Sequence, residues 1–329
     1  LMAFSTSKNA ARVNSVSLSG LAEGTYEFQV GDSNSDADND WSATQTFTVA
    51  PVGDNTSFFV MGDTQMSGNR TVDADSIAIL EKLGAQLNGK DVDFGLQTGD
   101  YVDNGSNYAM WEEIQEVFSA SFPTVDYIHT LGNHEYYGDA TGAIANKLLQ
   151  LPSKDYYSVE YGDVYVAVIN NSADLEEACQ WLIDDAAKSD CTWKVLSIHQ
   201  PPYYTNANGG SERFNKAIPA AADAAGIDVV FSGHDHSYAR TPALRNGEES
   251  DNGTVYFICG DLGEKSRNVN YAITSDFKYE CTSQTYEGLM LYVTADSKTL
   301  SVTAYDSADG TIVDSVTLNS PCANGHDYS

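Results

Sequence analysis

The chain has few basic residues: 17 lysines and arginines stand against 47 aspartates and glutamates among 329 residues, a formal net charge of -30. A surface this acidic repels nucleic acid phosphates and anionic membranes, so we exclude a role in binding polyanions. No apolar run approaches the roughly 18 residues that a membrane-spanning helix needs. The hydrophobic fraction of 42% and the 20 tyrosines argue against disorder, so we interpret the charge as a solvated surface around a folded core.

Cysteine is also scarce, and its spacing excludes one class of metal site. None of the five cysteines forms a CxxC pair, which argues against a zinc ribbon. Cys179 with Cys191, and Cys259 with Cys281, are spaced to form short-loop disulfides, with reduced buried cysteine as the alternative. This pairing and the acidity favour an extracellular or cell-surface location. The chain opens on Leu1 without a signal peptide, and we interpret it as a trimmed piece of a longer protein.

The first 52 residues predict a separate β module. Residues 14–49 contain short alternating segments such as "GTYEFQV" and "WSATQTFTV", separated by glycine, aspartate and asparagine turns. Three or four strands are too few to close a β-sandwich. We therefore expect an open strand edge, covered by the rest of the protein or used for association with another chain.

Residues 53–320 predict a layered α/β domain, followed by a tail at 321–329. Apolar runs that end in polar residues alternate with helical patterns, and from 287 onward the pattern changes to β-hairpins. The predicted helices cover residues 73–88, 110–118, 174–188 and 211–225. Such alternation is typical of a sheet covered by helices.

Metal-competent side chains fall at the ends of five predicted strands. These residues are Asp63, Asp100, Asn133 with His134, His199, and His234 with His236. Because the carboxyl ends of strands in open α/β sheets converge on one crevice, residues far apart in sequence can meet there. Four of the six histidines belong to this set. The sequence therefore predicts a metal centre at this crevice.

The residue types indicate which metals fit. Carboxylate, amide and imidazole without thiolate suit Fe, Mn or Zn. Two ions about 3.5–4 Å apart, joined by a bridging carboxylate, stabilise both the attacking and the leaving oxygen of a phosphoryl displacement. The histidines of "GHDH" alternate along the chain, so each could face a different ion.

Five motifs in order carry a family resemblance. They are "GDTQ" (62–65), "GDYVDNG" (99–105), "GNHE" (132–135), "SIHQPPY" (197–203) and "GHDHSYAR" (233–240). Together they resemble the calcineurin-like metallophosphoesterase superfamily, and within it the purple acid phosphatase-like branch. The resemblance implies a layered metallophosphoesterase fold, with two mixed β-sheets flanked by helices. The N-terminal strands resemble the C-terminal half of the fibronectin-type β-sandwich that precedes the catalytic domain in that branch.

By this resemblance Asp100 bridges two divalent or trivalent transition-metal ions. One ion is completed by Asn133, His199 and His234, and the other by Asp63, His236 and Gln65. Gln65 stands where most of the superfamily has histidine, although some branches use glutamine there. His134 would lie beside the phosphate, to stabilise the transition state or protonate the leaving oxygen. The implied reaction is hydrolysis of a phosphate ester by a metal-bound hydroxide.

Other motif residues have supporting roles or open alternatives. Glu135 and Asp235 are expected to support the ligands rather than to bind metal. Asp103 occupies the place of the tyrosine that colours true purple acid phosphatases, and in the wider superfamily this aspartate supports the catalytic histidine. Tyr203 could line the substrate cleft or pack a proline-rich turn. Arg240 could meet a phosphate oxygen, but we favour a structural ion pair.

The leading hypothesis is thus a binuclear-metal phosphomonoesterase or phosphodiesterase acting on a small phosphate ester. The alternative is a surface binding module whose phosphoesterase domain has lost activity, for which Gln65 is the one supporting feature. A serine hydrolase is excluded because the chain has no G-x-S-x-G nucleophile elbow.

Overall fold

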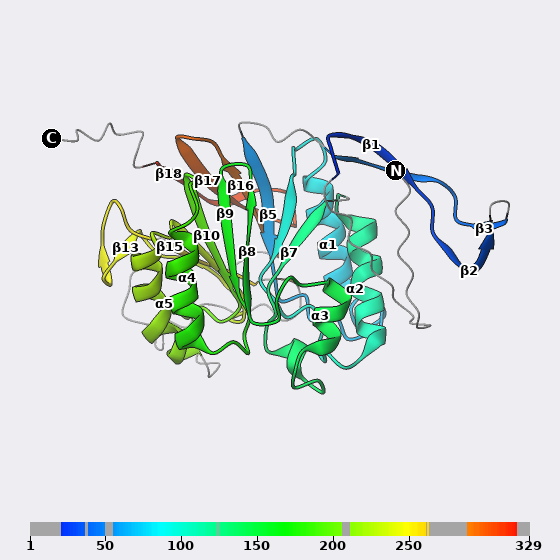
Figure 1. The fold of residues 1–329 in the computed structure, drawn as a ribbon, viewed down its shortest axis with the longest axis horizontal. Coiled ribbons are helices and arrows are strands. Elements are labelled where there is room, and N and C mark those ends of the chain that lie inside the picture. Colours follow the sequence, from blue (N-terminus) through cyan, green and yellow to red (C-terminus); the bar gives the residue numbers. More distant parts are fainter. Residues whose placement is uncertain are drawn as a thin grey trace.

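Two six-stranded mixed sheets form the body of the molecule (Figure 1). The structure is a computed structural model that describes residues 21–36, 39–49, 55–123, 125–205, 211–260, 262 and 288–320. The first sheet has the order β18-β17-β16-β5-β6-β7, and the second has the order β12-β15-β11-β10-β9-β8.

The first sheet joins three parallel strands to three antiparallel ones. Strands β5, β6 and β7 are parallel neighbours, and β16, β17 and β18 continue the sheet as an antiparallel meander from β5. The strands are β5 (Thr56–Met61), β6 (Phe94–Gln97), β7 (Asp126–His129), β16 (Leu289–Ala295), β17 (Thr299–Asp306) and β18 (Ile312–Asn319).

The second sheet repeats this plan with four parallel strands. Strands β9, β10, β11 and β15 are parallel neighbours, and the antiparallel strands β8 and β12 form the two edges. The strands are β8 (Tyr156–Tyr161), β9 (Val164–Ile169), β10 (Trp193–Ile198), β11 (Val229–Ser232), β12 (Tyr238–Arg240) and β15 (Val255–Cys259). A small hairpin of β13 (Leu244–Arg245) and β14 (Glu248–Glu249) extends beyond β12.

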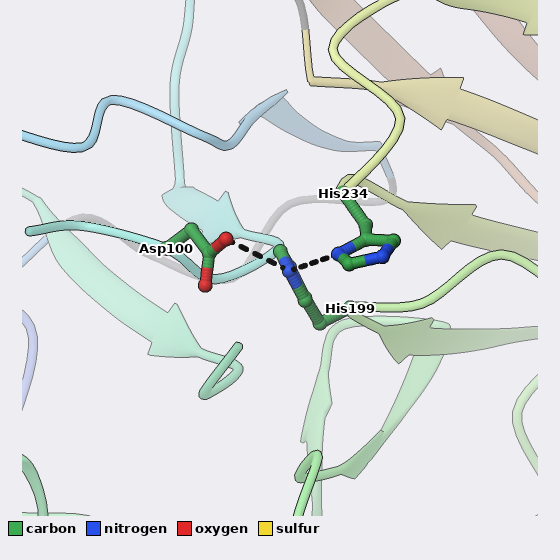
Figure 2. A group of neighbouring side chains, drawn as sticks. All are labelled: Asp100, His199 and His234. Carbon is green, nitrogen blue, oxygen red and sulfur yellow. Dashed lines mark hydrogen bonds and ion pairs between the residues drawn. The ribbon is translucent and has the colours of Figure 1, made fainter. Parts of the chain in front are cut away.

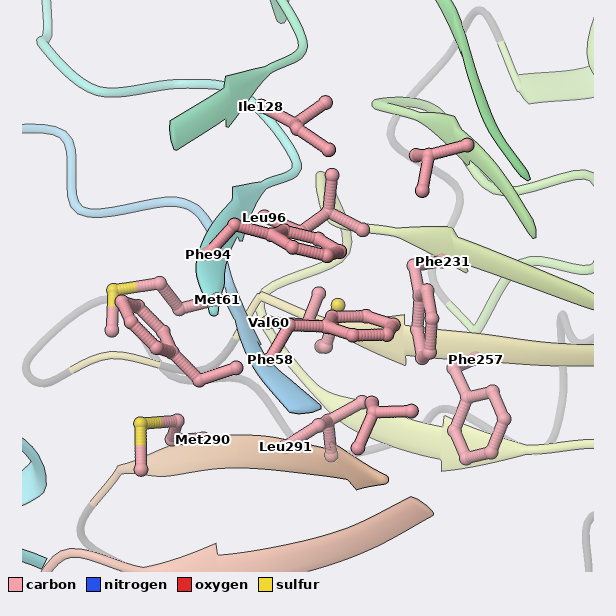
Figure 3. Close-up of a cluster of buried hydrophobic side chains, with 14 of the residues drawn as sticks. Phe58, Val60, Met61, Phe94, Leu96, Ile128, Phe231, Phe257, Met290 and Leu291 are labelled. Carbon is pink, nitrogen blue, oxygen red and sulfur yellow. The ribbon is translucent and has the colours of Figure 1, made fainter. Parts of the chain in front are cut away.

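Aromatic side chains fill the space between the two sheets (Figure 3). Phe58 of β5 stacks on Phe94 of β6, with ring centroids 4.5 Å apart, and meets Phe231 of β11 edge-on at 6.3 Å. Strands β5, β9, β11 and β15 are buried along their whole length. Continuous apolar runs of this kind are typical of parallel strands covered on both faces, which explains why these segments do not alternate.

Helices cover the outer faces of the sheets. The described helices are α1 (Ala74–Gln86), α2 (Tyr108–Ser121), the short 3-10 helix η1 (His134–Tyr136), α3 (Ala143–Leu149), α4 (Leu175–Ala186) and α5 (Ser211–Ala225). Helix α1 buries Leu80 and Leu83 in the core of the first sheet, whereas α4 and α5 form a second apolar cluster over β9 and β10. Among these helices, none has both the length and the apolar character of a bilayer-spanning segment.

Among the described residues, the four N-terminal strands form ladders only with one another. Strand β1 (Gly24–Phe28) pairs with β4 (Gln45–Val49), and β2 (Gly31–Asp36) pairs with β3 (Asn39–Trp41). Figure 1 shows these strands (dark blue) projecting from the side of the molecule near α1. Residues 21–36 and 39–49 thus contain two two-stranded sheets. The fibronectin resemblance and the boundary at residue 52 stay predictions.

The layered fold with two mixed sheets and flanking helices is confirmed. The four predicted helices correspond to α1, α2, α4 and α5, and the predicted hairpins correspond to β16–β18. The sequence patterns did not reveal α3 or the β8–β9 hairpin.

The predicted disulfide between Cys179 and Cys191 is wrong, because both thiols are free. Seven residues of α4 separate Cys179 from the end of the helix at Ala186, a rise of about 10 Å. A disulfide needs Cα atoms within about 7 Å of each other. Cys259 is also free, and its predicted partner Cys281 lies outside the described residues.

Candidate metal centre

Loops from both sheets converge at the carboxyl ends of their parallel strands. The loops after β5, β6 and β7 come from the first sheet, and those after β10, β11 and β15 come from the second. They bring together Asp63, Gln65, Asp100, Asn133, His134, His199, His234 and His236. The convergence expected from the sequence therefore places all of these residues in one region.

One group of three potential ligands is centred on His199. Figure 2 shows Asp100, His199 and His234 pointing toward one another from three different loops. His199 Nε2 lies 3.1 Å from Asp100 Oδ2 and 3.3 Å from His234 Nδ1. His199 Nδ1 lies 2.9 Å from the carbonyl oxygen of Thr98. A hydrogen bond donated to that carbonyl leaves the Nε2 lone pair directed at the site, the tautomer that a metal ligand needs.

A second group shares Asp100 with the first. One ligand atom from each of Asp63, Asp100 and His236 lies within 4.8 Å of the others, as in the group of Asp100, His199 and His234. His236 Nε2 is 3.5 Å from Asp63 Oδ1. All three side chains are buried. Asp100 therefore has the position of a carboxylate between two clusters of donors.

The two amide residues make different contacts at the centre. Asn133 Oδ1 is 3.2 Å from His199 Nε2, so it belongs with the first group. Gln65 is buried, and its Nε2 donates to Asp100 Oδ2 at 3.2 Å. Rotation of the amide about its last bond would present Oε1 to a cation in place of Nε2.

His134 lies at the edge of the centre, and the backbone orients its ring. Its Nδ1 is 2.9 Å from the carbonyl oxygen of Asp103, and its Nε2 is 3.8 Å from Asp100 Oδ2. Its backbone N–H donates to Asp100 Oδ1 at 2.9 Å. The backbone carbonyl of Asp103 therefore contacts the His134 ring, and the supporting role of the Asp103 carboxylate stays a prediction. His134 faces the centre without being part of either ligand group.

Glu135 connects the loop after β6 with the loop after β7. Its carboxylate is fully buried and accepts hydrogen bonds from the backbone N–H groups of Asp100, Tyr101 and Gly132 at 2.9, 2.8 and 2.7 Å. Burial and the negative charge of Asp100 raise the pKa of Glu135 to about 7. Glu135 therefore ties the loop after β6 to the loop after β7, as expected for a residue that supports the ligands.

Several candidate ligands have a strained backbone conformation with positive φ. The described residues contain seven non-glycine residues with positive φ, and five of them are candidate ligands: Asp63, Gln65, Asp100, His234 and His236. A non-glycine residue in this region costs free energy, of order 1 kcal/mol or more, and persists only where the surrounding structure holds it. Such concentration of strain is typical of a functional site rather than of a structural turn.

Glycines make room for the carboxylates. A Cβ atom on Gly233 would lie 2.3 Å from Asp63 Oδ2, and one on Gly132 would lie 2.2 Å from Asp100 Oδ1. Gly260, which follows β15, is closer still, since its Cβ would lie 1.7 Å from Asp63 Oδ2. Sequence reasoning missed Gly260, because "GDLG" carries no metal-binding signature.

The buried carboxylates of Asp63 and Asp100 lie close together, and His199 is the main group that could balance their charge. Burial raises the pKa of Asp63 well above its usual range, and the nearby charge of Asp100 adds to this effect. Burial alone would raise the pKa of Asp100 and lower that of His199. Their mutual attraction and hydrogen bond instead hold the pKa of Asp100 far below its usual range and raise the pKa of His199 to about 10. A bound cation would stabilise both carboxylates and displace the proton from His199.

The remaining motif residues have structural contacts. Arg240 Nε donates to Asp314 Oδ2 at 2.7 Å, which is the ion pair that the acidic composition favoured. Tyr203 packs edge-on against Tyr256, with ring centroids 4.7 Å apart, and a position in the substrate cleft stays a prediction. Asp235 accepts hydrogen bonds from the backbone N–H and the hydroxyl of Thr205, which ties the loop after β10 to the "GHDH" turn.

Tyr101 and His129 belong to the core beside the centre. The Tyr101 hydroxyl pairs with His129 Nδ1, and burial raises the pKa of Tyr101 well above its usual range. Burial also lowers the pKa of His129 to about 4. The Tyr101 hydroxyl is therefore engaged by a core residue, and the raised pKa keeps it a neutral phenol.

The donor set fits two cations of the Fe, Mn or Zn type. Both groups combine carboxylate oxygen with imidazole nitrogen, and the three cysteines in the described residues are not among the clustered donors. Asp100 is common to both groups. His199 Nδ1 contacts the carbonyl of Thr98, which leaves the Nε2 lone pair of His199 free to bind a metal ion. The residues present therefore match what two adjacent metal ions require.

Comparisons with known proteins agree with this architecture. The family model described as calcineurin-like phosphoesterase matches residues 56–238. Purple acid phosphatase 22 of Arabidopsis thaliana is 26% identical over 201 residues, which cover 55% of this chain and 46% of that protein. "Probable inactive purple acid phosphatase 27" of the same plant is 21% identical over 350 residues, covering 89% of this chain and 55% of that protein.

The similarity extends to three dimensions. A purple acid phosphatase from yellow lupin (Lupinus luteus) seeds superposes with a TM-score of 0.73 at 17% identity, over 90% of this chain and 59% of that one. At this identity the match shows the fold alone. The chain spans about half the length of the curated relatives that it matches.

Proposed function

The chain belongs to the calcineurin-like phosphoesterase family, and from that premise we propose that it is a binuclear-metal hydrolase of small phosphate esters. The observation that carries this proposal is the position of Asp100, which is common to two groups of buried donors. A single carboxylate between two such groups is the arrangement required to hold two metal ions side by side. The acidic surface favours small organic phosphates over long nucleic acids.

Each candidate ligand has a place in the proposed centre. Asp100 would bridge the ions, with Asn133, His199 and His234 on one ion and Asp63, Gln65 and His236 on the other. When bound, the ions would supply Lewis acidity, which lowers the pKa of water toward neutrality and balances the phosphate charge. Fe, Mn and Zn all suit these oxygen and nitrogen donors.

The protein's own residues would orient and protonate the substrate. His134 is the proposed acid, because its Nε2 faces the Asp100 side of the centre and its Nδ1 contacts the carbonyl of Asp103. When protonated, this ring can stabilise negative charge on the phosphoryl group or donate its Nε2 proton to the leaving oxygen. Glu135 would keep the loops of Asp100 and His134 in register through its three backbone hydrogen bonds.

We place this activity outside the cell or at its surface. The acidic composition supports that placement, whereas the free thiols of Cys179 and Cys191 remove the disulfide argument for it. Reaction of the folded protein with a thiol reagent, before and after exposure to oxygen, would measure whether these thiols persist.

The decisive experiment compares wild type with Asp100→Asn on p-nitrophenyl phosphate and on its bis-ester, after loading with Mn²⁺ or Zn²⁺. The asparagine keeps the size of the side chain and removes the bridging charge, so we expect a loss of at least about 100-fold in kcat/KM. Asp75→Asn, in the exposed first turn of α1, is the matched control and should retain full activity. Unchanged hydrolysis by Asp100→Asn would show that the bridging-carboxylate mechanism is wrong.

A second candidate function is a binding module without catalysis. Two observations favour it: Gln65 turns an amide nitrogen toward Asp100, and one relative is named as probably inactive. Against it, two groups of three buried donors share Asp100, as a functional centre requires. Metal analysis separates the two functions, since a binding module would hold fewer than one transition-metal ion per chain and stay inactive after metal addition.

A further inference from the structure

Tyr137 lies on the side of the candidate metal centre that faces solvent. Asn133 and His134 are partly exposed, whereas the other candidate ligands are buried: Asp63, Gln65, Asp100, His199, His234 and His236. The His134 side chain is 22% exposed. A phosphate ester arriving from solution therefore meets this side, and its leaving group has to point outward past His134.

The ring of Tyr137 flanks this approach. It follows η1 directly, it is 48% exposed, and its centroid lies 4.6 Å from that of the His134 ring. Singly exposed large side chains are ordinary on protein surfaces, so exposure alone assigns nothing. The position of the Tyr137 ring is what suggests a role in substrate binding, because the ring contacts His134, the residue proposed to protonate the leaving oxygen.

The ring is held in place at both ends. Asn133 Nδ2 donates to the Tyr137 hydroxyl at 3.0 Å. The backbone N–H of Tyr137 donates to the carbonyl of His134 at 3.1 Å, and its carbonyl accepts from the N–H of Ser106 at 3.2 Å. An aromatic side chain that is already fixed loses little conformational entropy when a ligand packs on it.

We propose that Tyr137 determines substrate specificity, by packing its exposed ring against the leaving group and so favouring phosphate esters of planar aromatic alcohols. The inference deepens the proposed hydrolysis and rests on the same site. Aromatic pairs gain from offset or edge-to-face packing beyond the area they bury, which a saturated ring of equal size does not. The preference expected from one such pair is about 3- to 10-fold.

The test uses phosphonates, whose phosphorus–carbon bond the protein cannot hydrolyse. Binding of phenylphosphonate and cyclohexylphosphonate to the metal-loaded protein is measured by calorimetry for wild type, Tyr137→Phe and Tyr137→Leu. Wild type should prefer the phenyl compound about 3- to 10-fold, the Phe variant should keep a preference, and the Leu variant should lose it. Tyr108→Leu, a 40% exposed tyrosine at the start of α2, is the matched control and should behave as wild type.

Several outcomes would overturn the inference. Equal binding of both phosphonates by wild type, no binding of either, or an undiminished preference in Tyr137→Leu would each refute it. Tyr137→Trp provides a second variant if the Leu variant folds poorly, and its larger ring should keep or raise the preference. Hydrolysis of p-nitrophenyl phosphate is measured in parallel: an inactive protein that still prefers phenylphosphonate refutes the proposed function, while an active protein without that preference refutes only the role of Tyr137.

Discussion

Replacing Gly260 by alanine is the sharpest test of how the second group of ligands is built. The added Cβ would lie 1.7 Å from Asp63 Oδ2 and 2.7 Å from Asp63 Cγ. Ordinary carbon–oxygen contacts are about 3.4 Å or more, so the carboxylate must move by at least about 1.7 Å. Both Asp63 oxygens accept from the backbone N–H of His234 at 2.9 Å, and Oδ1 is 3.5 Å from His236 Nε2. The movement would break this arrangement.

We expect the variant to lose affinity at one cation site and to keep the other. Displacing a residue that positions a metal ligand lowers affinity by about 10- to 100-fold, and here the ligand itself moves. The three atoms nearest to the added Cβ belong to Asp63 and Gly233. The group of Asp100, His199 and His234 is therefore disturbed only through the lost hydrogen bonds between the His234 N–H and Asp63, and it should still bind. Overpacking should also lower the free energy of unfolding by about 1–3 kcal/mol. Calorimetric titration of the metal-free protein with Mn²⁺ or Zn²⁺ measures the two affinities.

The control is Gly84→Ala in α1. Its Cβ would lie 1.8 Å from the carbonyl oxygen of Ser121 at the end of α2, a clash of equal severity far from the metal centre. This variant should lose stability and still bind two ions with wild-type affinity. Two ions bound with wild-type affinity by Gly260→Ala would refute the reasoning, since the carboxylate would then tolerate the displacement.

Two further predictions concern acidity and colour. Burial raises the pKa of Asp228 to about 6, so the folded protein binds the proton more tightly than the unfolded chain does. The free energy of unfolding therefore falls by up to about 3 kcal/mol as the pH rises from 4 through 6. Asp228→Asn has no carboxyl group to ionise and so avoids this loss. In urea unfolding, the variant should be more stable than wild type at pH 7 and equally stable near pH 4. An equal difference in the free energy of unfolding between variant and wild type at both pH values would contradict this. The Fe-loaded protein should be colourless, because Asp103 replaces the tyrosinate and Tyr101 pairs with His129; a visible charge-transfer band would contradict that assignment.

The sequence could indicate the ligand set because the ligands follow recognisable strands. Asp63, Asp100 and His199 each come directly after an apolar run, and parallel strands bring their carboxyl ends together. The helices were readable for the same reason, since apolar residues at helical spacing mark α1 and α4. Such features depend on local spacing, which the sequence contains.

Other features depend on contacts that leave no local pattern. The role of Gly260 exists only because β15 ends beside Asp63, almost 200 positions earlier in the chain. His134 is oriented by the carbonyl of Asp103, and a backbone carbonyl has no signature in residue type. The free thiol of Cys179 likewise follows from the length of α4 rather than from cysteine spacing.

The sequence by itself thus determined the family, the alternation of strands and helices, and which side chains gather at the strand ends. Only the tertiary structure decided the contacts around them: Gly260 beside Asp63, the carbonyl of Asp103 at the His134 ring, and Tyr137 exposed over His134. The physical reason is that residue type and periodicity report what a segment buries and where it turns. Which segments meet at a strand end, and at what distance, is set by how the two sheets pack on each other.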